Sequence, residues 1–182
     1  MPADAQVIVY TGRLDDGQKN VLRLTDALVE VLSERPRVFA VCAGEGPHRA
    51  EVLARAARAG LRGRLLAPGY VDAVFALLRR ADVFVSPSHY EGRPNTVAEA
   101  LAARAPACLS RIPQHTEFVP ADAAIFVDPT RVGEIAAALR ACLDDPDAAR
   151  LRAARARAVV ERQSVAAMSA AYESLYERVL RA

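Results

Sequence analysis

Short, almost wholly apolar runs alternate with helical patterns along nearly the whole chain, and this alternation constrains the fold most strongly. Strands that alternate with helices form a parallel sheet covered on both faces, and strands buried on both faces are apolar throughout. The pattern therefore predicts an α/β, Rossmann-like, three-layer domain with a parallel sheet of about six strands. The expected strands are Val7 to Tyr10, Val38 to Ala43, Leu65 to Ala67, Asp82 to Ser86, Ala107 to Leu109 and Ala124 to Val127.

The helical patterns lie between these strands and continue beyond the last of them. Gly60 and the pair Asp145-Pro146 are residue types that end helices. We expect one domain over residues 1–182, with a core over about 6–145 and C-terminal helices over 147–181, because no repeat or low-complexity linker divides the chain. The expected helices are Val21 to Leu32, Arg49 to Ala59, Val71 to Arg80, Thr96 to Arg104, Glu134 to Leu143, Asp147 to Val160 and Val165 to Leu180, with a break near Gln163-Ser164.

Charge and hydropathy exclude several classes of protein. A net charge of +2 over 182 residues is too small to indicate nucleic-acid binding. No apolar run reaches the roughly 20 residues that span a bilayer. The start, Met1 to Asp4, has no basic region followed by a long apolar stretch. We therefore expect a cytoplasmic protein without a signal peptide that binds no nucleic acid.

The three cysteines do not form a metal or disulfide motif. Cys42, Cys108 and Cys142 are far apart and odd in number, and no CxxC pair is present. Cys42 and Cys108 lie inside expected strands, so we interpret both as core thiols in a reducing compartment. No metal is expected.

The loop after the first expected strand carries two cations. Ligands of Rossmann-like sheets bind outside the carboxyl ends of the strands. Gly12 permits a tight turn there, Arg13 offers a forked donor, and Lys19 a compact charge, which together suit a diphosphate. The loop lacks the GxGxxG and P-loop patterns, so two solvated charges are the alternative. Lys19 is nevertheless the only lysine beside 23 arginines, and the only asparagines, Asn20 and Asn95, also lie in the candidate loops.

The loop after the fourth expected strand carries two carboxylates, Glu91 and Glu99, eight positions apart. The following helix start offers free backbone N–H groups and the positive end of its dipole, and Gly92 lets a ligand approach. A carboxylate beside such an anion site accepts hydrogen bonds from sugar or ribose hydroxyls. Three alternatives stay open: Thr96 and Glu99 form a capping box, Glu91 is simply solvated, and His89 is a lone loop histidine or a base.

In order and spacing, these motifs resemble those of the family 4 (group 1) retaining glycosyltransferases, specifically the C-terminal donor-binding domain of their GT-B fold. The resemblance covers roughly residues 6 to 145, and five weak motifs in the right order make it specific. They are Gly12-Arg13-Leu14 with Lys19, Gly44-Glu45-Gly46-Pro47, Ala67-Pro68-Gly69-Tyr70-Val71, Pro87-Ser88 leading through Glu91 to Glu99, and Ile112-Pro113-Gln114-His115-Thr116-Glu117.

The resemblance implies roles for the site residues. Arg13 and Lys19 would bind the donor diphosphate and stabilise the departing nucleoside diphosphate, and Glu91 would hold a sugar hydroxyl. These three are the expected catalytic residues. Glu99 would accept from the ribose. The remaining expected donor-binding residues are Gly12 in the turn, Tyr70 and Val71 near the base, and Gly92, Arg93, Pro94, Asn95 and Thr96 around the sugar and phosphates.

The resemblance also implies a reaction without cofactor or metal, in which the nucleoside diphosphate leaves on the face that the acceptor attacks. The substrate implied by the resemblance is a nucleoside-diphosphate sugar. The sequence departs from the family pattern at Arg93, where Phe or Met is common, and at Pro113-Gln114-His115, which replaces a glycine pair and leaves the role of Glu117 open.

The family's N-terminal acceptor domain has no counterpart in the sequence. Three interpretations follow: a catalytic domain separated from its other half, a subunit completed by a partner chain, or a nucleotide-sugar-binding module without activity. Peripheral contact with the inner membrane face through the absent half is a further expectation. A response-regulator-like sheet is disfavoured because only Asp82 and Asp128 come near an acidic cluster, and an epimerase of the same layout would also need the second domain.

The C-terminal region carries an apolar stripe and a row of arginines. The stripe predicts self-association or a partner unless it packs on this domain's own core. The arginines are interpreted as a solvated helix face, with anionic lipid as the alternative. The stripe comprises Val165, Met168, Tyr172, Leu175, Tyr176, Val179 and Leu180, and the arginines are residues 150, 152, 155 and 157.

Overall fold

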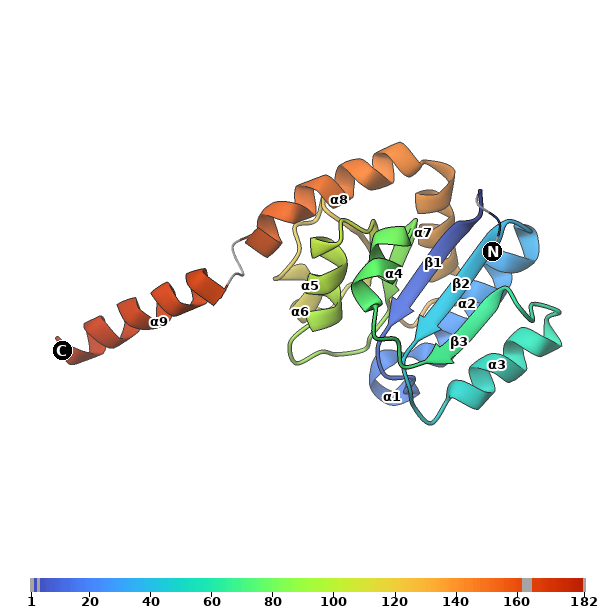
Figure 1. Cartoon of the computed structure of the whole chain (residues 1–182), viewed down its shortest axis with the longest axis horizontal. Coiled ribbons are helices and arrows are strands. Elements are labelled where there is room, and N and C mark those ends of the chain that lie inside the picture. The colour runs from blue at the N-terminus through green and yellow to red at the C-terminus, as the bar shows by residue number, and fades with distance from the viewer. Residues whose placement is uncertain (1, 3, 162–164, 182) are drawn as a thin grey trace.

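The chain forms a six-stranded parallel sheet in the order β3-β2-β1-β4-β5-β6 with helices on both faces (Figure 1). The computed structural model describes residues 2, 4–161 and 165–181. The α/β, Rossmann-like, three-layer prediction is confirmed. The strands are β1 (Gln6–Thr11), β2 (Val38–Ala43), β3 (Leu65–Gly69), β4 (Val83–Ser86), β5 (Ala107–Ser110) and β6 (Ile125–Val127).

Alternate side chains of the central strand face two separate cores. Val7 and Val9 of β1 join one core, on one face of the sheet, whereas Ile8 and Tyr10 join the other core, on the opposite face. Because both faces are covered, the strands are apolar at nearly every position. The helices are α1 (Asp16–Lys19), α2 (Val21–Glu34), α3 (Arg49–Arg58), α4 (Val74–Arg80), α5 (Asn95–Ala102), α6 (Pro113–Thr116), α7 (Val132–Asp144), α8 (Pro146–Glu161) and α9 (Val165–Leu180).

Several local features differ from the predictions. The helix expected from Val71 begins only at Val74, so Tyr70 and Val71 lie in the loop after β3. The short helices α1 and α6 were not expected, because four-residue segments are too short to show helical periodicity. All three cysteines are buried and free, as expected for Cys42 and Cys108.

Helix α9 extends away from the body of the domain (Figure 1). The described side chains of the stripe, from Met168 to Leu180, are all exposed, so packing on this domain's own core is wrong for them. The side chain of Val165 and the break near Gln163-Ser164 lie outside the described residues. Among the described helices, none is long and apolar enough to cross a bilayer.

Deleting residues 165–182 is expected to leave the melting temperature within about 2 °C of the intact chain, because α9 buries no described side chain. Deletion of residues 147–182 is the control. It also removes Ala149, Ala153 and Ala156 of α8 from the core and should lower the melting temperature clearly. Circular dichroism melts measure both. A clear loss of stability in the shorter deletion would mean that α9 packs on the domain in solution.

Candidate functional site

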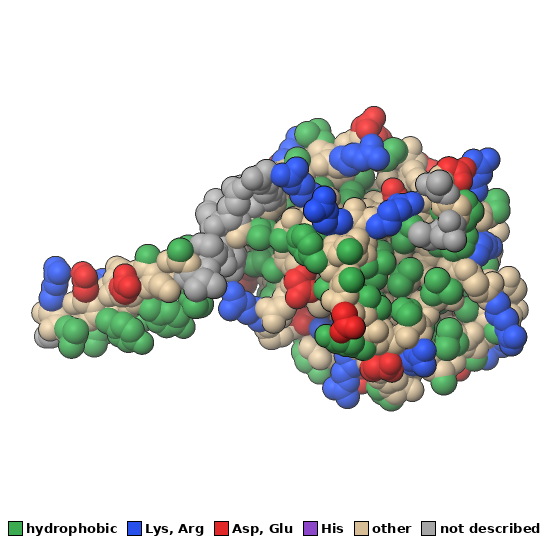
Figure 2. Space-filling model, in the orientation of Figure 1, with side chains coloured by type: hydrophobic (Ala, Val, Ile, Leu, Met, Phe, Trp, Pro, Cys, Tyr) green, Lys and Arg blue, Asp and Glu red, His purple; other side chains and the backbone are tan. Residues whose placement is uncertain are grey.

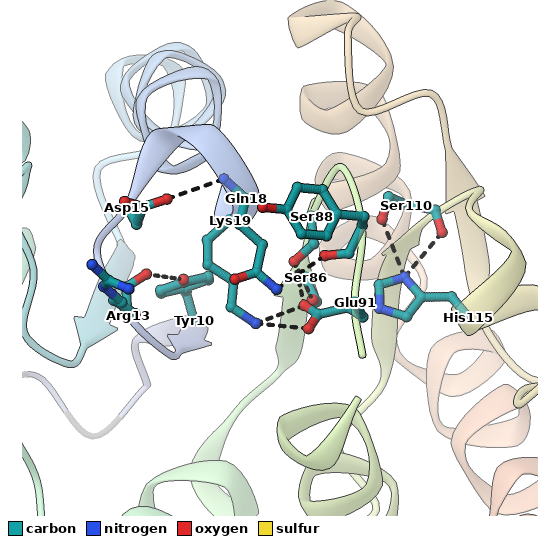
Figure 3. Close-up of polar contacts among 11 residues, drawn as sticks. Tyr10, Arg13, Asp15, Gln18, Lys19, Ser86, Ser88, Glu91, Ser110 and His115 are labelled. Atoms are coloured by element: carbon teal, nitrogen blue, oxygen red, sulfur yellow. Dashed lines mark hydrogen bonds and ion pairs between the residues drawn. The ribbon is translucent and has the colours of Figure 1, made fainter. Parts of the chain in front are cut away.

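The two candidate loops meet at the carboxyl ends of the adjacent strands β1 and β4. The ammonium of Lys19 donates to both carboxylate oxygens of Glu91, 72 positions away, at 2.7 and 2.8 Å (Figure 3). The Lys19 side chain is 17% exposed and that of Glu91 is 5% exposed. The only lysine of the chain is therefore paired with a buried carboxylate at the edge of the sheet where ligands of this fold class bind.

The position of Lys19 is fixed by the residue that follows it. Lys19 ends helix α1 rather than lying in a loop, and Asn20 then takes a left-handed conformation with φ 57°. Asparagine tolerates this conformation, and its buried amide donates to the carbonyls of Pro87, at 3.1 Å, and Pro129, at 2.6 Å. Asn20 thus joins the β1 loop to the β4 loop. The rarity of asparagine in this chain drew attention to Asn20, but the sequence alone did not show which residues it bonds to.

Arg13 lies on the same edge with its side chain exposed. The Tyr10 hydroxyl donates to the Arg13 carbonyl at 2.7 Å, and the Gly12 N–H donates to Ala43 of β2 at 3.0 Å, so the backbone of the turn is held. Burial raises the pKa of Tyr10, which keeps its hydroxyl protonated as a donor. The Arg13 guanidinium has no hydrogen bond or ion pair to a described residue. It is therefore a free cation on a fixed backbone.

Glu91 is buried among donors. The Ser88 hydroxyl donates to its Oε1 at 2.6 Å, and the Ser86 and Ser88 hydroxyl oxygens lie 3.5 Å apart. The residue is only 8% exposed, so the alternative of a solvated loop carboxylate is wrong. Charge-assisted hydrogen bonds of this kind fix the orientation of the carboxylate. No sequence pattern indicated that Ser88 would hydrogen-bond to Glu91, because serine is common in loops.

The capping-box alternative for Glu99 is also wrong. Helix α5 begins at Asn95 with Pro94 as its N-cap, and no side chain caps it. Glu99 therefore lies in the second turn, beyond the position from which a capping glutamate reaches back. The Glu99 side chain is exposed and bonds to no described residue.

The first turn of α5 faces solvent next to Glu91. Gly92, Arg93 and Asn95 are exposed, Thr96 is half-buried, and Pro94 is buried and has no N–H to offer. The Arg93 guanidinium bonds to no described residue. The backbone N–H groups of this turn and the helix dipole make the region favourable for an anion.

Other predicted residues are not drawn into this cluster. Tyr70 is 78% exposed at the carboxyl end of β3, which is separated from β1 by β2. Val71, beside it, is half-buried, and Glu117 at the end of α6 is exposed. His89 is half-buried, and its backbone N–H donates to the Gln18 carbonyl at 2.8 Å.

His115 is buried near the candidate site. In the sequence it stands out only because it departs from the family pattern. Its Nδ1 lies 3.0 Å from the Ser110 carbonyl oxygen and 3.1 Å from the Ser110 hydroxyl (Figure 3). Its Nε2 is buried without a partner among the described residues. Burial lowers the pKa of His115, so the ring is neutral at pH 7. No local pattern predicts this burial, because it arises from the packing of α6 on β5.

The cluster presents two cations and a helix start beside one buried carboxylate. The Arg13 and Lys19 charges and the N–H groups of α5 suit a bound phosphate, and the carboxylates suit hydroxyl donors. Among residues 2, 4–161 and 165–181, no group of three or more His, Cys, Asp and Glu side chains is placed to hold a metal ion.

Known proteins share this sequence pattern and fold. The family model described as glycosyl transferases group 1 matches residues 5–145. Glycogen synthase of Mycobacterium tuberculosis is 35% identical over 153 residues, which cover 82% of this chain and 37% of that protein. This chain thus spans less than half of that relative's length.

Solved structures show the same fold at lower identity. Anabaena HepE in complex with UDP and glucose matches with a TM-score of 0.85 at 21% identity, covering 96% of this chain and 49% of that one. The C-terminal domain of LpcC, a group 1 glycosyltransferase of Francisella tularensis, matches with a TM-score of 0.78 at 22% identity, covering 86% and 84%.

Proposed function

Because this chain belongs to the group 1 glycosyltransferases, as a C-terminal domain of their GT-B fold, we propose that it binds the nucleoside-diphosphate sugar of a retaining sugar transfer. The observation that carries the proposal is the contact between Lys19 and Glu91 at the carboxyl ends of β1 and β4. It brings a cation suited to the diphosphate and a carboxylate suited to the sugar hydroxyls to one point. The acceptor in this proposal is a glycan or a lipid-linked acceptor.

Each residue has a role that follows from its position. The exposed guanidinium of Arg13 donates to diphosphate oxygens. The Lys19 ammonium has three N–H donors, and the one that is not bonded to Glu91 donates to the diphosphate as well. Glu91 accepts from a sugar hydroxyl, and Glu99 from the ribose. The N–H groups at the start of α5 meet the phosphates, and Tyr70 and Val71 lie toward the base.

The chemical contribution of this domain is electrostatic. Negative charge grows on the nucleoside diphosphate as the sugar leaves, and fixed cations stabilise it. A preorganised donor of this kind is worth roughly 2.7–4 kcal/mol in the transition state. Arg13, Lys19 and the α5 N–H groups supply such donors without a metal. Groups outside this chain position the acceptor and close the cleft over the donor.

The isolated chain is expected to bind one of UDP, GDP and ADP in calorimetric titration. Arg13→Ala should weaken this binding about 10- to 100-fold, because one charge-assisted contact is lost. The fold should be unaffected, since the guanidinium bonds to no described residue. Arg62→Ala, which removes an exposed arginine between α3 and β3, is the matched control. Binding that is equal in both variants, or absent from the folded chain, would contradict the proposed site.

A further inference from the structure

A hollow lies on the edge of the sheet opposite the candidate site, at the amino ends of β4 and β5. It encloses about 860 Å³ between the last turn of α4, the end of α5 and the start of α8. Its lining includes four arginines, Arg79, Arg80, Arg104 and Arg150, against one carboxylate, Asp82. We call it the arginine groove. Figure 2 shows basic side chains, in blue, along α8, where the sequence has arginine only.

The single carboxylate of the groove already accepts hydrogen bonds within the protein. Asp82 Oδ2 accepts from the Val7 N–H at 2.7 Å and from Arg80 at 3.0 Å, so it ties the groove floor to β1. Arg80 also donates to the Ala5 carbonyl. Arg80 and Asp82 are therefore structural, and their charges offset each other.

The other arginines have no such explanation. Arg79 and Arg104 are exposed, and their guanidinium groups bond to no described residue. Arg150 has only Asp147, at 3.2 Å, in an exposed pair of the kind that contributes little. Cations in the last turn of a helix are favoured by its dipole, which accounts for Arg79 on α4. The dipole does not account for three loosely held guanidinium groups that converge on one hollow.

Arg104 adds an independent observation. Its backbone is left-handed, with φ 61°, directly after the end of α5. The Ala105 N–H donates back to the Ala100 carbonyl at 3.0 Å, as in helix ends where glycine takes the left-handed position. Glycine adopts this conformation without a Cβ penalty, whereas arginine does not. A side chain at a position that favours glycine indicates that the guanidinium itself has a use.

We propose that the arginine groove is a second binding site, separate from the proposed donor site, for a ligand that carries a phosphate group. Arg79, Arg104 and Arg150 grip the phosphate oxygens as forked donors. The volume is within the range of small-molecule sites, and Phe75, 46% exposed, offers an apolar wall for the rest of the ligand. The phosphate belongs either to a free phosphorylated compound or to a lipid headgroup, which share this chemistry.

The test is a residue-resolved NMR titration of the chain with inorganic pyrophosphate, which separates the two sites by their amide signals. Signals of residues 79–82, 102–106 and 146–154 should shift, independently of those of the donor site at 12–20 and 91–96. The double variant Arg79→Ala/Arg104→Gly should weaken binding in the groove at least about 10-fold, at an unchanged or higher melting temperature. The control Arg58→Ala/Arg62→Ala removes the same charge elsewhere.

A second arm uses sedimentation with phosphatidylcholine vesicles, with and without phosphatidylglycerol. Cosedimentation with the anionic vesicles, lost in the groove variant and kept in the control, assigns the phosphate to a lipid headgroup. Pyrophosphate shifts without cosedimentation assign it to a free compound. An absence of groove response to both probes overturns the proposal, as do responses that the groove variant leaves unchanged. Either result leaves the donor-site signals as a separate readout of the proposed function.

Discussion

Replacing Lys19 by methionine should lower the free energy of unfolding by about 3 kcal/mol, because the buried Glu91 carboxylate then loses its counter-charge. The pair is bidentate, and the Glu91 side chain is 5% exposed, so water does not replace the lost ammonium. Only the Ser88 hydroxyl remains as a donor to the carboxylate among the described residues. Urea unfolding at pH 7 measures the change.

The control for this substitution is the double variant Lys19→Met/Glu91→Gln. It removes both charges and should unfold closer to the wild type than Lys19→Met alone, because no unpaired charge is left buried. Glu91→Gln alone completes the cycle. A coupling free energy below about 0.5 kcal/mol would mean that the pair behaves as an exposed surface ion pair and that the cleft edge is wet.

Gly44→Ala should lower the free energy of unfolding by about 4 kcal/mol, a cost in the range of severe backbone and packing changes. Gly44 has φ 143°, and a Cβ there would lie 1.9 Å from the carbonyl oxygen of Gly12. That neighbour is backbone, so the turn that carries Arg13 would have to move. The same substitution should therefore also weaken nucleoside-diphosphate binding in whatever fraction still folds.

Gly133→Ala is the matched control for Gly44→Ala. Gly133 lies in the first turn of α7, and a Cβ there meets nothing within 4 Å. Alanine favours the helix, so this variant should gain about 0.5 kcal/mol. Chemical unfolding of both variants gives the comparison. Equal midpoints would show that the ends of β1 and β2 separate more easily than their backbone contact indicates.

Local patterns were sufficient for the architecture. The apolar runs predicted six strands and the three-layer class, because a strand that is buried on both faces shows as a short continuous apolar run. They were insufficient for element ends. The N-cap lies at Pro94, rather than at Thr96 as the capping box requires, so Glu99 is outside the capping position, and a shift of two residues is below the resolution of a periodic pattern.

The candidate site was likewise predictable from the sequence only in part. Arg13, Lys19, Glu91 and Glu99 were recognisable as candidates because their residue types follow strands, and strand ends are where such sheets bind ligands. Their chemical state was not recognisable. Glu91 is buried and paired whereas Glu99 is exposed and unpaired, although both are glutamates beside one helix start.

The chain's order of residues thus settled the fold class, the family and the edge of the sheet that carries the candidate residues. Spatial packing settled the Lys19–Glu91 pair across 72 positions, the hold of Ser88 on Glu91, the burial of His115 and the convergence of Arg79 and Arg104 in the groove. The physical reason is the distance along the chain over which each effect acts. Periodicity and turn chemistry act over a few neighbouring residues, whereas burial and pairing depend on which strands lie side by side, and β1 lies beside β4 only in the folded sheet.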